Sequence, residues 1–454
     1  MKSKRAFLTI FCMVFVFFGG LFPNAAALED PQPQARAAFL ADPESGFVLY
    51  ENNADTQMYP ASTTKIMTAL LVLENVDDLD ALAEVTEEDF IGVEADTSQA
   101  GFMVGEQLPI IDLLYGLMLP SGNEAANTLA RYVGGSVDGF VDMMNERAAE
   151  LGCENTHFSN PNGLHDDNHY TTARDLYTIT RQAMQDETFQ DIVSTAQKTL
   201  SANNMTEARG GNPLKVYTTN MLIYSRHRPE YYAYATGVKT GHTSQSGYCL
   251  VASAEKNGGQ LISVLLGCEM PEGATQPLSF SETIRLFEWG FENFESQELI
   301  AEGETVEQIE VRLSTEEDQL VLVTADSVSG TVPTDIDLAD VERTIDVPDS
   351  VDAPITAGQK IGTMRVSYNG VDYGSVDLVA LSDVSRSDVL YYADMIENFF
   401  QSNLFKVLVV VIIVLFIVYF SLIIFRSRRR KKRRQQMMKS KQARYRDYDK
   451  RDRH

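Results

Sequence analysis

The alternation of apolar and polar positions predicts a mixed α/β region over the first two thirds of the chain. Two short apolar runs separated by a Pro-Glu-Ser-Gly turn predict a β-hairpin over residues 37–50. Apolar positions at helical spacing predict helices over residues 62–74, 111–117, 124–133, 140–151 and 281–294. Largely apolar runs predict strands over residues 233–239, 248–254 and 261–267. Because strands lie at both ends with helices between them, we expect one antiparallel sheet flanked by helices, with a helical subdomain in the middle.

A change of pattern near residue 297 separates a second domain from the first. Alternating apolar positions beyond it predict strands over residues 306–313, 320–323, 364–368 and 371–381. The Asn369-Gly370 pair predicts a tight turn between the last two of these strands. We therefore expect a small, acidic, all-β domain over residues 297–385. Residues 386–405 carry apolar side chains at helical spacing, which predicts an amphipathic juxtamembrane segment.

Both ends of the chain contain apolar segments typical of membrane targeting. Lys2, Lys4 and Arg5 precede an apolar run that ends in three alanines, which predicts a signal peptide over residues 1–27. Residues 407–425 are apolar and uncharged over a length that spans a bilayer, which predicts one transmembrane helix over residues 406–425. The first globular domain then occupies residues 28–296, and residues 426–454 form a basic tail.

Charge is segregated along the chain. The 454 residues include 38 Lys and Arg and 64 Asp and Glu, a formal net charge of −26. The tail beyond residue 425 carries +12 and the first five residues +3, so the remainder carries −41. An acidic body argues against nucleic-acid binding, because a phosphate backbone requires a basic protein face. Lys and Arg directly after a membrane span mark its cytoplasmic side, so we expect residues 28–405 on the extracellular face of the cell membrane.

Cysteine and histidine usage predicts neither a disulfide framework nor a metal centre. Beyond the predicted signal peptide only Cys153, Cys249 and Cys268 occur. The last two lie on neighbouring predicted strands, so a bridge between them is geometrically open, but small buried apolar side chains are the simpler interpretation. The loop of residues 155–170 holds three histidines without the spacing of a metal site. We therefore expect no metal and no cofactor.

Three short motifs are candidates for carrying chemistry: Ser62-x-x-Lys65, Ser121-x-Asn123 and Lys239-Thr240-Gly241. A separation of three residues at the start of a helix places Ser62 and Lys65 on one face. A serine hydroxyl needs a base to become a nucleophile, and a lysine can serve if burial lowers its pKa. The apolar residues that follow Lys65 would supply that burial.

The three motifs and their surroundings resemble the penicillin-binding proteins and serine β-lactamases. The segments at residues 49–53, 60–70, 114–126, 160–164, 169–175 and 237–242 are similar to the serine-type D-alanyl-D-alanine carboxypeptidases among the low-molecular-mass penicillin-binding proteins. The resemblance implies an α/β catalytic domain of the penicillin-binding/β-lactamase-like class, followed by the all-β domain and the membrane helix. It also implies that the substrates are peptidoglycan stem peptides ending in D-Ala-D-Ala, and that β-lactams act as inhibitors.

The same resemblance implies roles for individual residues. Ser62 would attack the carbonyl between the two D-alanines, Lys65 would be the base, and Ser121 would pass a proton to the leaving amine. Substrate-binding residues would be Asn123, Lys239, Thr240, Gly241 and His242. Within that set, Asn123 would bind the peptide amide, and Lys239 and Thr240 would bind the terminal carboxylate. Backbone N–H groups of Ser62 and His242 would form the oxyanion hole.

Alternatives and departures accompany this hypothesis. A serine β-lactamase, a cross-linking transpeptidase and a catalytically idle cell-wall-binding protein remain open; class A β-lactamases add a glutamate that residues 155–170 lack in the required pattern. Some relatives place an arginine before the last helix of the catalytic domain to bind the carboxylate, and here that region holds Ser279. The second motif has Gly122 where many relatives have other residues, and we expect this difference to have little effect.

Overall fold

The computed structural model describes residues 30–224 and 228–451. The predicted signal peptide therefore lies outside the described residues. The chain divides into two compact units, of which the first contains the residues up to Ile300 together with Val328–Arg343 and Val366–Gly374. The second contains Ala301–Ser327, Thr344–Arg365 and the residues from Ser375 onward.

A five-stranded antiparallel sheet forms the centre of the first unit, in the order β2-β1-β9-β8-β7. Its strands are β1 (Ala37–Ala41), β2 (Val48–Asn52), β7 (Ala235–Thr243), β8 (Gly247–Lys256) and β9 (Gly259–Cys268). The hairpin at the chain start joins the later strands because β1 pairs with β9, with Phe39 opposite Val264. This arrangement confirms the predicted sheet and leaves β7 at one edge.

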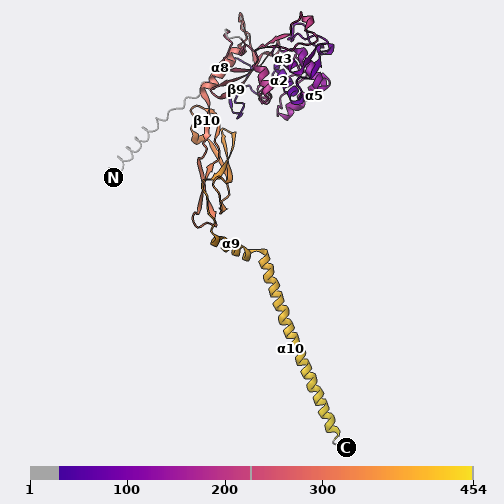
Figure 1. The fold of residues 1–454 in the computed structure, drawn as a ribbon, viewed down its shortest axis with the longest axis vertical. Coiled ribbons are helices and arrows are strands. Elements are labelled where there is room, and N and C mark those ends of the chain that lie inside the picture. The colour runs from indigo at the N-terminus through magenta and orange to yellow at the C-terminus, as the bar shows by residue number, and fades with distance from the viewer. Residues whose placement is uncertain (1–29, 225–227, 452–454) are drawn as a thin grey trace, which may run out of the picture. The chain divides into compact units, whose positions relative to one another are not determined.

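Helices cover both faces of this sheet. They are α2 (Lys65–Asn75), α3 (Ile110–Met118), α4 (Asn123–Gly134), α5 (Val137–Glu150), α6 (Ala173–Ala183), α7 (Glu187–Ser194) and α8 (Leu278–Asn293). In Figure 1, strand β9 of this sheet lies between α8 and α2. Strand β9 alternates between two cores: Ile262 and Val264 belong to the core beneath α2 to α7, whereas Leu261 and Leu265 pack with α8. Alternating side chains point to opposite faces of a strand, which accounts for one helix on one face and a helical subdomain on the other.

Several short elements were not predicted. The first turn of the predicted helix at residue 62 is a 3₁₀ helix, η1 (Ala61–Thr64), and the α-helix begins only at Lys65. Four short strands and two further 3₁₀ turns frame the helical subdomain: β3 (Leu82–Glu84), η2 (Glu87–Phe90), β4 (Gln107–Pro109), β5 (Gln197–Thr199), η3 (Glu207–Arg209) and β6 (Lys215–Tyr217). Three or four residues are too few to show a period, so pattern analysis misses such elements.

The remaining strands confirm the all-β domain. Strand β10 (Phe294–Ile300) pairs with β13 (Val328–Pro333). A six-stranded sheet has the order β14-β16-β17-β12-β11-β15. Its members are β11 (Thr305–Arg312), β12 (Gln319–Thr324), β14 (Glu342–Asp346), β15 (Ser350–Asp352), β16 (Lys360–Tyr368) and β17 (Val371–Ala380), and a 3₁₀ turn, η4 (Leu338–Asp340), precedes β14.

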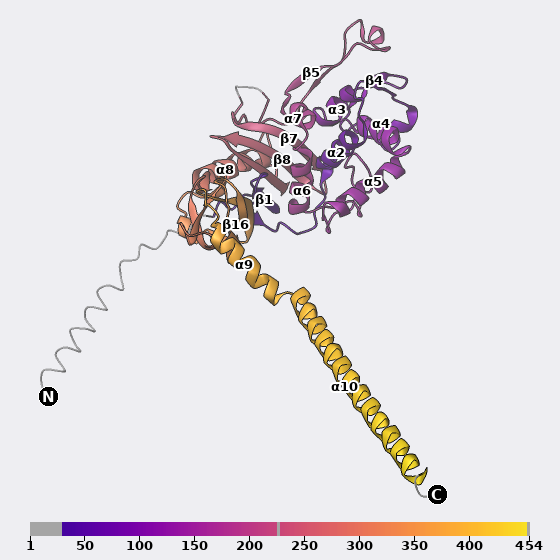
Figure 2. The same cartoon turned by 60° about the horizontal axis from the view of Figure 1, so that its bottom comes forward.

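Two helices end the chain (Figure 2). The amphipathic segment forms α9 (Asp388–Gln401), along which several large apolar side chains are exposed: Val389, Leu390, Tyr392, Met395, Ile396, Phe399 and Phe400. Helix α10 (Asn403–Arg451) is long and apolar enough to cross a membrane by length and composition, and it is the one such helix among the described residues.

Candidate active site

The first motif brings a serine hydroxyl to a buried amine. Lys65 Nζ lies 3.0 Å from Ser62 Oγ. The side chain of Lys65 is also hydrogen-bonded to Asn123 Oδ1 at 2.8 Å and to the backbone carbonyl of Asn162. Because η1 precedes α2 without a break, the three-residue separation places both side chains on one side of the turn.

Burial changes the chemistry of this amine. Lys65 has no exposed surface, and Ile66 and Met67 beside it are buried as well. Loss of solvation holds the pKa of Lys65 well below its ordinary value, the neighbouring Lys239 lowers it further, and Glu124 opposes both. The expectation that apolar surroundings desolvate this lysine is therefore supported by its environment.

The second motif forms a strained turn directly before α4. Ser121 has φ = 67°, a conformation that non-glycine residues rarely adopt. Its side chain is buried, and Ser121 Oγ has no hydrogen-bond partner. A buried hydroxyl without a partner, held in a strained backbone conformation, is typical of a group kept ready for a ligand.

Gly122, at which the second motif differs from many relatives, occupies a sterically restricted position. A Cβ atom at this position would lie 2.8 Å from both Ala100 Cβ and Gly116 O, closer than carbon atoms approach in folded proteins. The N–H of Gly122 donates to that same carbonyl at 2.9 Å. Only glycine fits between α3 and the loop at Ala100, so this residue fixes the position of the turn that carries Ser121 and Asn123.

The third motif lies on the edge strand β7. Lys239 is 1% exposed and donates to the carbonyl of Thr240 at 3.0 Å, and burial lowers its pKa to about 7. The hydroxyl of Thr240 lies 2.6 Å from that of Thr219. His242 is exposed and stacks on Tyr248 with a ring-centroid distance of 4.1 Å, so its side chain points away from the buried lysines.

Strand β7 lies directly against the turn that carries Ser62. A Cβ atom on Gly241 would come within 3.1 Å of the backbone nitrogen of Ser62 and 3.0 Å of the carbonyl oxygen of Pro60. The glycine of the third motif thus permits close approach of the two backbones. All three motifs therefore meet in one place.

Sequence analysis missed the role of the loop at residues 160–164. This loop supplies the Asn162 carbonyl to Lys65, and the Asn162 side chain donates to Asn127 Oδ1 at 3.1 Å. Gly163 has φ = 85°, and a Cβ there would collide with the carbonyl of Ala61 at 2.0 Å. A backbone acceptor leaves no mark in the side-chain sequence, so motif spacing could not indicate this contact.

The histidine-rich loop supports the site through hydrogen bonds. The N–H of Ser159 donates to His169 Nδ1 at 2.9 Å, so the proton of the neutral ring lies on Nε2, 2.7 Å from Thr64 Oγ1. Burial lowers the pKa of His169 to about 4, which keeps the ring neutral. Within the part of the chain that the structure describes, no group of three His, Cys, Asp or Glu side chains is placed to hold a metal ion.

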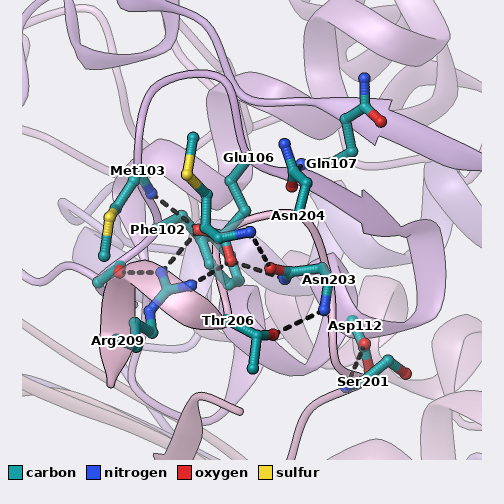
Figure 3. Close-up of polar contacts among 12 residues, drawn as sticks. Phe102, Met103, Glu106, Gln107, Asp112, Ser201, Asn203, Asn204, Thr206 and Arg209 are labelled. Carbon is teal, nitrogen blue, oxygen red and sulfur yellow. Dashed lines mark hydrogen bonds and ion pairs between the residues drawn. The ribbon is translucent and has the colours of Figure 1, made fainter. Parts of the chain in front are cut away.

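A buried ion pair fixes the loop that borders the second motif (Figure 3). Both carboxylate oxygens of Glu106 accept from Arg209 at 2.6 Å, and Asn203 Nδ2 and the N–H of Met103 complete the set of donors. Arg209 also donates to the carbonyl of Gly101, whose own N–H donates to Glu124 Oε1. Beside Gly101, the carbonyl of Ser98 accepts from the N–H of Asn123 at 3.0 Å.

The three cysteines and Ser279 contribute no group to this site. Cys153, Cys249 and Cys268 are free, buried thiols, so the structure contains no bridge between the last two. Ser279 is buried in the first turn of α8, the helix on the sheet face opposite α2.

Comparisons with known proteins agree with this geometry. A family model described as D-alanyl-D-alanine carboxypeptidase matches residues 24–270, and one described as the C-terminal domain of penicillin-binding protein 5 matches residues 294–386. The chain is 28% identical to D-alanyl-D-alanine carboxypeptidase DacF of Bacillus subtilis, over 86% of this chain and 97% of the relative. It is 30% identical to DacA of Haemophilus influenzae, over 85% and 94%.

A solved structure shows the same architecture. Penicillin-binding protein 5 from Haemophilus influenzae superimposes with a TM-score of 0.60 at 29% identity, covering 79% of this chain and all of the other. The family model alone covers more than half of the chain. The chain therefore belongs to the D-alanyl-D-alanine carboxypeptidase family, with an α/β catalytic domain followed by a domain of the penicillin-binding protein 5 C-terminal type.

Proposed function

We propose that Ser62 is the nucleophile of a serine D-Ala-D-Ala carboxypeptidase, which removes the terminal D-alanine from peptidoglycan stem pentapeptides. The activity is that of the family to which the chain belongs. Ser62 Oγ attacks the carbonyl carbon of the penultimate D-alanine, and the terminal D-alanine leaves as a free amino acid. Water then hydrolyses the resulting ester and restores the serine. Penicillins, which carry a reactive amide of similar shape, acylate the same oxygen.

The observation that carries this proposal is the set of three contacts made by Lys65 Nζ. A neutral amine has two N–H donors and one lone pair. The Asn123 and Asn162 oxygens take up the two donors, so the lone pair is directed at Ser62 Oγ. The burial that lowers the lysine pKa favours this neutral form. Lys65 is then a general base in contact with the proton that it removes.

The other motif residues complete the reaction. Ser121, whose hydroxyl has no partner, passes a proton to the leaving amine of D-alanine. Lys239 and Thr240 bind the terminal carboxylate, and Asn123 binds the peptide amide of the substrate. Strand β7 offers its open edge to the extended peptide, and the N–H groups of Ser62 and His242 stabilise the oxyanion. Gly241 contributes by allowing the strand to approach Ser62.

We further propose that the enzyme works on the extracellular face of the cell membrane. The apolar part of α10 is a membrane anchor, and the lysines and arginines after residue 425 hold the tail on the cytoplasmic side. In this organisation residues 1–27 are a signal peptide, 28–296 the catalytic domain and 297–385 the β-domain. Residues 386–405 lie at the membrane surface, 406–425 span the bilayer and 426–454 form the tail. The acidic body argues against nucleic acid as a partner.

D-Alanine release from a synthetic stem pentapeptide tests this function. The wild type is expected to release one D-alanine per peptide, whereas Ser62→Ala, with the same melting temperature, releases none. Rapid hydrolysis of nitrocefin would instead favour a β-lactamase. Transfer of the acyl group to an added amine in preference to water would favour a transpeptidase. A folded wild type that releases no D-alanine would support the idle cell-wall-binding alternative and contradict the proposal.

A further inference from the structure

Thr219 lies between two of the catalytic motifs. It follows strand β6, and its N–H donates to the carbonyl of Leu119, two residues before Ser121, at 3.0 Å. The preceding residue, Thr218, donates its N–H to the carbonyl of Ala196 at 2.9 Å. The Thr219 side chain, which is half-buried, contacts Thr240 on the edge strand β7. One residue therefore connects the turn of the second motif to the strand of the third.

The contact between the two threonines restricts which hydroxyl proton is free. Their Oγ1 atoms are 2.6 Å apart, so one hydroxyl donates to the other. Each hydroxyl has a single proton. If Thr219 donates, the proton of Thr240 remains available for a ligand and Thr240 Oγ1 is polarised by the bond that it accepts. A terminal carboxylate is an acceptor only, and it therefore selects this orientation of the pair.

We propose that Thr219 is a positioning residue that makes the site selective for a free terminal carboxylate. It donates to Thr240 Oγ1 and thereby directs the Thr240 proton toward the carboxylate, which Lys239 binds electrostatically. Thr219 thus supplies a third polar group for the carboxylate site, acting through Thr240. This inference rests on the proposed function.

The test compares two substrates that differ only at the terminus: a pentapeptide ending in a D-alanine carboxylate and the same peptide ending in a D-alanine carboxamide. Thr219→Val removes the hydroxyl at nearly constant volume. It is expected to lower kcat/KM for the carboxylate peptide about tenfold, as loss of a hydrogen bond linked to a charged group does, and to leave the carboxamide peptide unchanged. Thr219→Ser restores the hydroxyl and is expected to restore the wild-type preference.

Thr236→Val is the matched control. Thr236 lies on strand β7, as Thr240 does. Its hydroxyl pairs with that of Ser253 at 2.7 Å, outside the three motifs. We expect it to leave the preference for the carboxylate unchanged. If Thr219→Val does not fold, Thr219→Ala serves in its place, with the melting temperature measured in parallel.

The outcomes separate this inference from the function on which it rests. A preference lost in Thr219→Val and regained in Thr219→Ser supports it. An equal loss of kcat/KM on both substrates shows a structural role for Thr219 and overturns the inference. A Thr219→Val variant that keeps the wild-type preference for the carboxylate also overturns it. A wild type that releases no D-alanine from the carboxylate peptide overturns the proposed function, and the inference fails with it.

Discussion

Two buried charged clusters in the first unit differ in how completely their polar groups are paired. Around Glu106, two N–H groups of Arg209, the amide of Asn203 and a backbone N–H satisfy the carboxylate. Around Lys65, the hydroxyl of Ser121 has no partner and the pKa values of two lysines are lowered. A fully paired buried charge stabilises one conformation, whereas an incompletely paired one is available for chemistry.

The largest effect is expected from changing the base of the incompletely paired cluster. Lys65→Arg keeps a positive charge but replaces an amine that can be neutral with a guanidinium that cannot. General-base catalysis is worth about 10²–10⁴-fold, so acylation by benzylpenicillin should slow by at least that factor. Stopped-flow acylation rates measure it, with thermal unfolding as the control for folding. A variant with the wild-type rate would remove Lys65 from the mechanism.

Removing one partner of the fully paired cluster should affect stability instead. Arg209→Met leaves the buried carboxylate of Glu106 without its cation, which costs about 3–5 kcal/mol of unfolding free energy. Arg147→Met is the control, because its ion pairs with Glu74 and Glu150 are solvent-accessible and worth about 0–1 kcal/mol. Urea denaturation measures both. An Arg209→Met variant as stable as the control would show that the stability of the Glu106 cluster does not depend on complete pairing of its polar groups.

The turn of the second motif offers a test that measures stability and acylation rate together. A methyl group at Gly122 must displace Ala100 or the carbonyl of Gly116, and overpacking of this kind costs about 1–3 kcal/mol. We expect Gly122→Ala to lose stability by that amount and to slow acylation, because Ser121 and Asn123 move with the turn. The same two assays measure the effects. Unchanged acylation would show that the turn does not need its present position.

The smallest expected effect is a pH dependence of substrate binding. With a pKa of about 7, Lys239 is charged below neutrality and loses its proton above it. Its attraction for the substrate carboxylate is therefore present in acid and lost in base, and KM should rise above pH 7 and level off about tenfold higher once this interaction is lost. A peptide with a terminal carboxamide should show no such rise in KM. A KM that stays constant to pH 10 would contradict the role of Lys239.

The sequence predicted the antiparallel sheet, the helical subdomain and the three motifs, because apolar alternation and local spacing encode them. It did not predict contacts between distant segments. Glu106 and Arg209 are 103 residues apart, and Lys65 contacts a carbonyl 97 residues away. The Thr219–Thr240 pair and the steric need for Gly122 depend likewise on how separate elements pack. Sequence spacing thus identified the reacting groups, and packing determined what holds them.

The most direct test of the central claim is the pH dependence of penicillin acylation at Ser62, followed by intact-protein mass spectrometry. We predict one covalent adduct on Ser62 at pH 7, none in Ser62→Ala, and an acylation rate that falls on acidification as the lone pair of Lys65 takes up a proton. An adduct that persists in Ser62→Ala, or an acylation rate that rises on acidification, would contradict the account.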